Sequence, residues 1–304
     1  METEVNKIEK KKFREKFEKF HDKNYKLLLL IPLILLIFSI GFMTDFYLKN
    51  HDILNRDVSL TGGTSITING NLDAQELKSA LSGKLQNLNV REISDISGKQ
   101  IAVILETKTE GALTKQITED YLGYNLTGAN SSFEFTGATL SQDFYFQLLI
   151  AILFSFLFMS IVVFIIFRTL VPSLAVILSA FMDIFMTLTV INLMGVQIST
   201  AGIVAFLMLI GYSVDTDILL TNRILKTHES INHGIFRAFK TGIMMTLTSI
   251  TAVIVAFIIL KPYGTVLNQI FVILAIGLCF DIFNTWITNV SILKWYVKRK
   301  KNEN

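Results

Sequence analysis

Six long apolar runs dominate the pattern of hydrophobic and polar positions along the chain. Each is close to the roughly 20 mostly apolar residues that a helix needs to cross a bilayer. The runs predict transmembrane helices at residues 26–46, 144–167, 171–194, 199–221, 242–260 and 265–293. The last run is long enough to tilt or to begin outside the hydrocarbon. We therefore expect an α-helical membrane protein with six spans.

The first run follows a basic segment, residues 1–25, as the apolar region of a signal peptide would. Its apolar stretch is longer than an ordinary signal-peptide core, and no A-x-A cleavage site follows it. We expect a retained anchor helix at 26–46, and residues 144–293 supply the other five helices.

Between the first two runs lie residues 47–143, a segment of soluble character. Its strand and helix signals follow the order β-α-β-β-α-β, which is typical of a ferredoxin-like α+β domain. Residues 58–70 alternate like a strand, and Gly62 and Gly63 mark a bulge or turn within it. Asp73, with Glu76 three positions later, predicts the start of the first helix. The segment holds no cluster with catalytic or metal-ligand spacing, so we expect it to bind or position a partner.

The composition agrees with a membrane protein, because 51% of the residues are hydrophobic, only 17% are charged and the mean hydropathy is +0.51. Cys279 is the single cysteine, so neither a disulfide framework nor a cysteine metal site is expected. We expect no cofactor, no metal and no enzymatic activity.

Positive charge predicts the orientation, because cytoplasmic loops are enriched in Lys and Arg. If six helices alternate, nineteen of the 28 Lys and Arg fall on one side. That side contains the N-terminus, the 222–241 loop with Arg223 and Arg237, and a basic tail at 294–304. We therefore expect a cytoplasmic membrane protein with both termini cytoplasmic and the 47–143 domain outside.

The basic ends also fit contact with anionic lipid on the inner leaflet. Because the bilayer explains these charges, they do not indicate nucleic-acid binding.

Four aspartates lie inside predicted spans, although a charged side chain in mid-bilayer costs at least ~2.5 kcal/mol on insertion scales. They are Asp183, Asp215, Asp217 and Asp281. The sequence places no Lys, Arg or His deep in any span. Each carboxylate must therefore be hydrated, protonated or partnered by a second protein. Intramembrane acids of this kind are typical of proton or ion paths.

Helical geometry separates the two neighbouring acids, because Asp215 and Asp217 lie about 200° apart around their helix. Asp217 shares a face with Ser213 and Thr221, whereas Asp215 shares one with Gly211 and Tyr212.

The sixth span carries a polar stripe with the spacing i, i+3, i+4, i+7 on one face. Its members are Asp281, Asn284, Thr285 and Thr288.

Residues 174–224 resemble the third and fourth spans of the SecD/SecF protein-export family, which belongs to the resistance-nodulation-division superfamily. The matching residues are Asp183, Gly211-Tyr212-Ser213 and Arg223-Ile224. The stretch "SLTGGTSITI", with Gly62 and Gly63, is similar to the first outer strand of the family. The resemblance covers nearly the whole chain and implies an archaeal-type SecF subunit.

The resemblance implies a function in which the chain, with a SecD-like subunit and the Sec translocon channel, uses the proton motive force to help exported polypeptides cross the membrane. Asp215 matches an acid of SecD, whereas the usual acid of bacterial SecF falls on Thr216. Asp215 is therefore the first candidate for the titrating group. Asp183 and Asp281 are expected to complete the path, and Asp217 and Asn284 are further candidates.

Three alternatives remain at this point. A self-contained small-molecule or ion exporter of the same superfamily would need a homodimer, because six spans form half of such a transporter. An intramembrane aspartyl protease would use Asp183 and Asp215 as a dyad, but the chain lacks the Y-D and G-x-G-D motifs of those enzymes. A purely structural scaffold is the third alternative.

Overall fold

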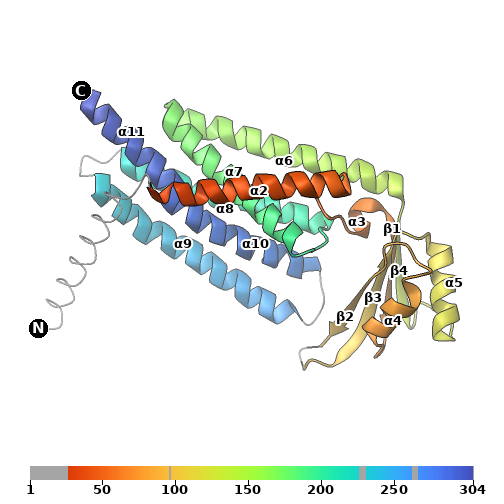
Figure 1. Cartoon of the computed structure of the whole chain (residues 1–304). Coiled ribbons are helices and arrows are strands. Elements are labelled where there is room, and N and C mark those ends of the chain that lie inside the picture. The colour runs from red at the N-terminus through yellow and green to blue at the C-terminus, as the bar shows by residue number, and fades with distance from the viewer. Residues whose placement is uncertain (1–26, 96, 226–230, 262–265, 304) are drawn as a thin grey trace, which may run out of the picture.

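The computed structural model describes residues 27–95, 97–225, 231–261 and 266–303. It consists of a bundle of long helices with a small sheet domain at one end (Figure 1). The C-terminal end of the chain lies at the opposite end of the bundle. The predicted basic segment 1–25 falls outside the described residues.

Within the described residues, six helices are long and apolar enough to cross a membrane. Five of them are α2 (Leu30–Asn50), α6 (Ala138–Phe167), α7 (Leu170–Leu193), α8 (Thr200–Leu225) and α9 (Ile231–Leu260). The sixth combines α10 (Val266–Phe283), a π-helical segment η2 (Asn284–Asn289) and α11 (Val290–Glu303). Each helix overlaps one predicted span, so the prediction of six membrane helices is confirmed.

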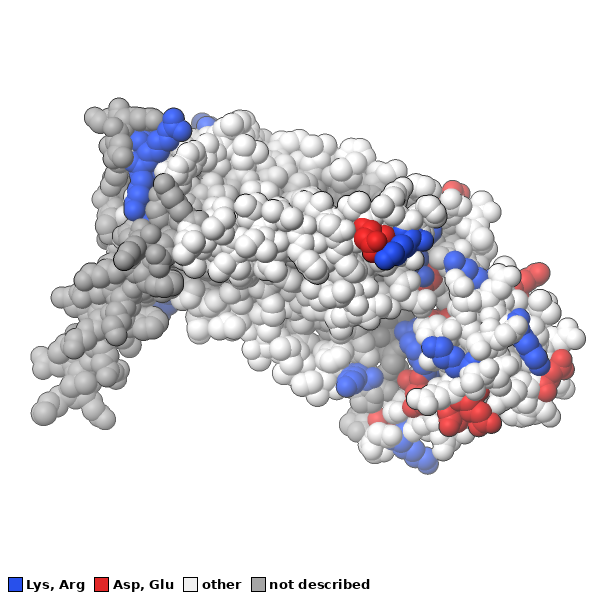
Figure 2. Space-filling model, in the orientation of Figure 1, with Lys and Arg blue, Asp and Glu red and all other residues white. Residues whose placement is uncertain are grey.

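The helices differ in how deeply they are buried. Within the most apolar 18-residue stretch of each helix, 56% is buried inside the protein in α7 and in α8, but only 6% in α6 and in α9. A helix that is apolar on its exposed faces needs lipid or another protein around it. Figure 2 agrees with this, because the visible charges lie on the sheet domain, on the end of the bundle beside it and at the opposite end, with a nearly uncharged surface between.

The sheet domain has the predicted ferredoxin-like topology. Strands β1 (Gly63–Asn69), β2 (Asn89–Ser94), β3 (Gln100–Thr107) and β4 (Ser131–Thr136) form one antiparallel sheet in the order β2-β3-β1-β4. Helix α4 (Ala74–Leu81) follows β1, and α5 (Gly111–Leu122) follows β3. The hydrophobic core of the domain includes Ile66, Leu77 and Leu105.

Asp73 caps the start of α4, as the sequence predicts. Its carboxylate accepts hydrogen bonds from the backbone N–H groups of Gln75 and Glu76, at 2.8 and 3.0 Å. These bonds satisfy two N–H groups that a helix leaves without partners in its first turn.

The first part of the predicted strand 58–70 is instead a helical turn, α3 (Val58–Thr61), and the strand begins at Gly63. The predicted turn at the glycine pair is present, with φ of +78° at Gly62 and +145° at Gly63. A Cβ on Gly63 would lie 2.3 Å from the Thr107 carbonyl oxygen. The close approach of β3 therefore requires glycine here.

At the end of the bundle opposite the sheet domain, the helices extend beyond the predicted spans. Helix α8 continues through Arg223 to Leu225 and α9 begins at Ile231, so most of the predicted 222–241 loop is helix and Arg237 lies on α9. The predicted 294–304 tail continues α11 to Glu303, and Lys294 is only 1% exposed. Lys and Arg are good helix formers, so the helices extend past the apolar runs from which the span ends were predicted.

Candidate functional site

Three aspartates from three different helices lie buried in the bundle. Asp183 is on α7, Asp217 on α8 and Asp281 on α10, and the side chain of each is inaccessible to solvent. We call these residues and the hydroxyl and amide side chains that contact them the carboxylate cluster. Among the described residues, every hydrogen-bond partner of the three carboxylates is a hydroxyl or a carboxamide.

Asp183 is held by α8 and by η2. The Ser213 hydroxyl donates to its Oδ2 at 2.5 Å, and the Asn284 side-chain amide donates to its Oδ1 at 2.7 Å. Thr288 contacts Asn284 in turn, with 3.4 Å between its Oγ1 and the Asn284 Oδ1. Ser213, named from the sequence as a motif residue, and Asn284, named as a path candidate, therefore hold the Asp183 carboxylate from two sides.

Asp217 accepts two hydrogen bonds from η2, and the Ser179 side chain of α7 also lies close to it. The Thr285 hydroxyl and the Asn289 side-chain amide both donate to its Oδ1, at 2.8 and 2.7 Å. Its Oδ2 is buried and has no hydrogen-bond partner among the described residues. A buried acceptor of this kind costs free energy until a proton, water or ion satisfies it.

Asp281 links the cluster to α9. Its Oδ1 lies 3.3 Å from the Thr285 hydroxyl, and its Oδ2 lies 3.3 Å from the Thr246 hydroxyl of α9. Thr285 therefore stands between Asp217 and Asp281, within hydrogen-bonding distance of both carboxylates.

The π-helical segment η2 supplies most of these partners, because Asn284, Thr285 and Asn289 all belong to it. Short π-helical segments inside α-helices occur frequently at functional sites. The predicted polar stripe on one face of this span is confirmed for Asn284 and Thr285, which both point to carboxylates. Asn289 was not identified as a site residue from the sequence. A second asparagine five residues after Asn284 in an apolar span was a signal that could have identified it.

Asp215 does not join the cluster. It is exposed on the surface of the chain together with Gly211 and Tyr212, whereas Ser213 and Asp217 are buried. The predicted separation of the two acids is thus confirmed. The expectation that Asp215 meets Asp183 and Asp281 in one path differs from the structure, because Asp217 takes that place. The Asp183–Asp215 dyad of the protease alternative is likewise not formed.

Among the described residues, no group of three His, Cys, Asp or Glu side chains has a geometry that would hold a metal ion. The predicted basic residues Arg223, on α8, and Arg237, on α9, each have an interaction partner of their own. Neither contacts the three carboxylates, whose partners are the hydroxyl and amide groups described above.

Comparison with known proteins identifies the family. Residues 118–299 match the family described as protein export membrane protein SecD/SecF, C-terminal. The chain is 40% identical over 281 residues to the protein-export membrane protein SecF of Methanocaldococcus jannaschii, covering 90% of this chain and 96% of that protein. It is 37% identical to SecF of Methanothermobacter thermautotrophicus, covering 91% and 94%.

A solved structure has the same fold. The crystal structure of SecDF from Thermus thermophilus, a translocon-associated membrane protein, superimposes with a TM-score of 0.68 at 16% identity. The superposition covers 90% of this chain and 38% of that longer chain. With 40% identity to one SecF along nearly its whole length and this shared fold, the chain belongs to the SecD/SecF family of protein-export membrane proteins.

Proposed function

We propose that this chain is an accessory subunit of protein export that works with a SecD-like partner and couples export to proton movement through the carboxylate cluster. The observation that carries the proposal is the burial of Asp183, Asp217 and Asp281 among hydroxyl and amide partners. Ionised carboxylates taken out of water cost several kcal/mol each unless a cation pairs with them. Three of them therefore bind protons, or a cation, more favourably than they stay ionised together.

The hydroxyl groups indicate where one proton resides. Thr285 has one hydroxyl proton but contacts carboxylate oxygens of both Asp217 and Asp281. Thr246 likewise contacts the Gly242 carbonyl at 3.2 Å and Asp281. If Thr285 donates its proton to Asp217, its contact with Asp281 is a hydrogen bond only when the Asp281 Oδ1 carries a proton, and the Asp281 Oδ2 then still accepts from Thr246. We therefore assign a proton to Asp281 in this proposal, with Asp217 accepting from Thr285 and Asn289.

Asp217 is the member best arranged to exchange a proton. Among the described residues, no donor lies within hydrogen-bonding distance of its Oδ2, whereas both oxygens of Asp183 and of Asp281 are engaged. A proton arriving at this oxygen would meet an unoccupied acceptor, and the Thr285 hydroxyl connects it with Asp281. Asp183, Asp217, Asp281 and Asn284 thus form the proposed proton path.

Asp215 has a separate role in this proposal. An exposed acid on a membrane helix needs a donor from outside the chain. Gly211 and Tyr212 are exposed on the same face of α8. We assign this face to the SecD-like partner, which would supply a donor to Asp215.

The remaining assignments follow the family. The partners are the Sec translocon channel and exported polypeptides, the location is the cytoplasmic membrane, and both termini are cytoplasmic. The sheet domain then lies outside, and the basic ends contact anionic lipid.

Export measured in inverted membrane vesicles tests the proposal. The complex of this chain with its partner is compared with Asp217→Asn and Asp215→Asn variants, with and without a proton gradient. Asp217→Asn is expected to lose the stimulation by the gradient while the complex assembles normally, because it removes the exchanging carboxyl. Asp215→Asn is expected to weaken co-purification of the partner. Full gradient-stimulated export by the Asp217→Asn variant would contradict the proposal.

A further inference from the structure

A residue of α3, which precedes the first strand of the sheet, caps the first turn of α8. The Ser59 hydroxyl oxygen, on α3, accepts a hydrogen bond from the Thr200 backbone N–H at 3.1 Å. The Ser199 hydroxyl oxygen accepts from the Gly202 N–H at 3.3 Å. Helix starts leave backbone N–H groups without partners, and here a distant segment satisfies one of them. The start of α8 is thereby tied to α3.

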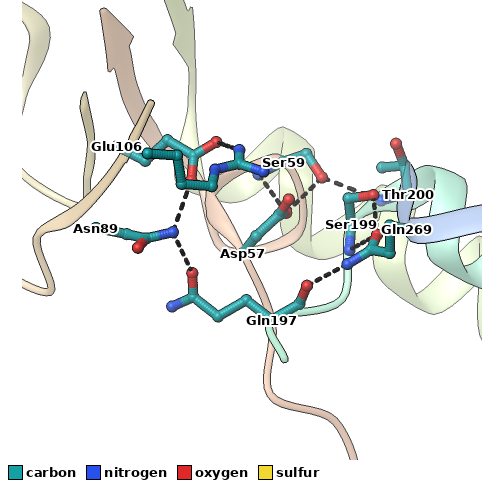
Figure 3. A network of polar contacts seen from close by, with 9 residues as sticks. Asp57, Ser59, Asn89, Glu106, Gln197, Ser199, Thr200 and Gln269 are labelled. Atoms are coloured by element: carbon teal, nitrogen blue, oxygen red, sulfur yellow. Dashed lines mark hydrogen bonds and ion pairs between the residues drawn. The ribbon is translucent and has the colours of Figure 1, made fainter. Parts of the chain in front are cut away.

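Asp57 holds Ser59 in place for this contact. Its Oδ1 accepts from the Ser59 hydroxyl at 2.6 Å and from the Ser59 N–H at 2.9 Å. Because the single hydroxyl proton of Ser59 points to Asp57, the oxygen of Ser59 is free to accept from Thr200. Figure 3 shows these contacts running from Asp57 through Ser59 to Thr200.

Gln269, near the start of α10, binds the residues just before α8 through its side chain. Its Oε1 accepts from the Ser199 N–H at 2.9 Å and from the Ser199 hydroxyl at 2.5 Å, and its Nε2 donates to the Gln197 carbonyl. A Cβ on Gly202 would lie 2.7 Å from the Gln269 Oε1. The absence of a side chain at Gly202 therefore makes room for Gln269.

The sheet is joined to these residues by side-chain contacts (Figure 3). The Asn89 amide, on β2, donates to the Gln197 Oε1 at 3.1 Å and to the Glu106 Oε2 at 3.2 Å. Glu106, on β3, pairs with Arg91. We call Ser59, Asn89, Gln197, Ser199 and Gln269 the latch.

The latch crosses a cleft of about 1180 Å³ between the sheet and the outer ends of α8 and α10. Its lining is rich in hydroxyl, amide and charged side chains. Water competes for polar contacts beside such a cleft, so each of these hydrogen bonds contributes little to stability. The sheet domain is thus held to the helices at this cleft by a few hydrogen bonds that can break individually.

The helices that carry the latch also carry the carboxylate cluster. Thr200 and Asp217 lie on α8, about 26 Å apart along the helix, and Gln269 and Asp281 lie on α10, about 18 Å apart. The two helices pack closely, since a Cβ on Gly277 would lie 2.4 Å from Cδ2 of Leu209. A shift of α8 against α10 at the cluster would therefore reach the latch.

We propose that Gln269 is a positioning residue whose bonds to Ser199 and Gln197 make the placement of the sheet domain depend on the relative position of α8 and α10. The inference rests on the proposed function, because it takes the cluster as the origin of the shift. It adds that the latch, rather than the chain connections alone, carries the change to the sheet domain.

The test measures the distance across the cleft by electron paramagnetic resonance in the reconstituted complex. Spin labels are attached at Lys78→Cys and Leu267→Cys in a Cys279→Ser background. Lys78 lies on α4 and Leu267 on α10, and both line the cleft outside the latch. Gln269→Leu is compared with Asn268→Leu, a control that removes bonds to the Leu260 and Lys261 carbonyls instead.

In the control, Asp217→Asn is expected to change the ratio of the populated distances at least about fivefold, a typical size for coupling between sites. In Gln269→Leu the same substitution is expected to change it less than about twofold. Ser59→Ala, which breaks the latch on its other side, is expected to behave like Gln269→Leu. If Asp217→Asn changes the distance ratio equally in the Gln269→Leu and control backgrounds, the proposed role of the latch is overturned. Normal gradient-stimulated export by Asp217→Asn would instead overturn the proposed function, so the two failures are distinguishable.

Discussion

At the scale of single residues, two acids that lie two positions apart on α8 have different surroundings. Asp217 is buried against η2, and Asp215 is exposed. Helical periodicity predicted that they face apart, but it gives only a relative angle. Which face turns inward depends on how α7, α8 and α10 pack, and that is a tertiary property. The sequence therefore could not choose between the two acids.

Thr285→Val tests whether the Thr285 hydroxyl connects Asp217 with Asp281 in the carboxylate cluster. Valine keeps the shape of threonine but removes the hydroxyl that lies between Asp217 and Asp281. We expect gradient-stimulated export to fall and the chain to lose about 1–3 kcal/mol of stability, because buried acceptors lose their donor. Thr285→Ser, which keeps the hydroxyl, serves as the control and is expected to retain most of the stimulation. Equal export by the two variants would contradict the bridging role of Thr285.

Asp57 gives a prediction about pH outside the membrane helices. Burial raises the pKa of Asp57 above its ordinary value, the Glu106 carboxylate adds to the shift, and the hydrogen bonds from Ser59 oppose it. A carboxyl whose folded-state pKa is raised contributes stability that is fully present below about pH 4 and is lost as the pH rises through the folded-state pKa.

Hydrogen exchange of the α3 amides measures this effect. After correction for intrinsic exchange rates, protection in the parent chain is expected to decrease as the pH rises above about 4. Asp57→Asn is uncharged and keeps an acceptor for Ser59, so its protection is expected to stay level. Parallel pH profiles for the two chains would show that Asp57 does not control this segment.

At the scale of elements, patterns with a local cause were predicted best. The order of strands and helices, the start of α4 at Asp73 and the turn at Gly62 and Gly63 all follow from short-range rules. The sequence did not reveal α3 or the π-helical turn. Asn and Thr side chains in η2 bond to carboxylates on other helices, and that long-range compensation has no local signal.

Gly242→Ala tests the packing of α9 against η2. A Cβ on Gly242 would lie 2.6 Å from Cζ2 of Trp286 and 3.2 Å from Cγ2 of Thr216. Trp286 also packs edge-on against Phe239, so its ring has little room to move. We expect a loss of about 1–3 kcal/mol, the usual cost of overpacking.

Thermal unfolding of the full chain measures this loss through Trp286 fluorescence in a Trp295→Phe background. Gly211→Ala is the matched control, because no atom lies within 4 Å of its added Cβ. An alanine in an open helical position is expected to be neutral or slightly stabilising. A Gly242→Ala chain as stable as the control would mean that α9 and η2 are not tightly packed.

At the scale of the whole molecule, the distribution of charge predicts the orientation. The bundle is nearly uncharged between its two ends (Figure 2). We expect Lys99→Cys, in the sheet domain, to react with a membrane-impermeant maleimide from outside intact cells in a Cys279→Ser background. Lys300→Cys, on α11, is expected to react only in inverted vesicles. The reverse pattern would contradict the proposed orientation.

The proposed proton coupling of the complex is most directly tested by proton flux. The complex with the SecD-like partner is reconstituted into vesicles that contain a pH-sensitive dye, and a potassium diffusion potential drives proton entry. The parent complex is expected to acidify the lumen, and a complex with Asp217→Asn is expected to acidify it no faster than protein-free vesicles. Unchanged proton flux through the Asp217→Asn complex would contradict the assignment of the buried carboxylate cluster as the coupling site.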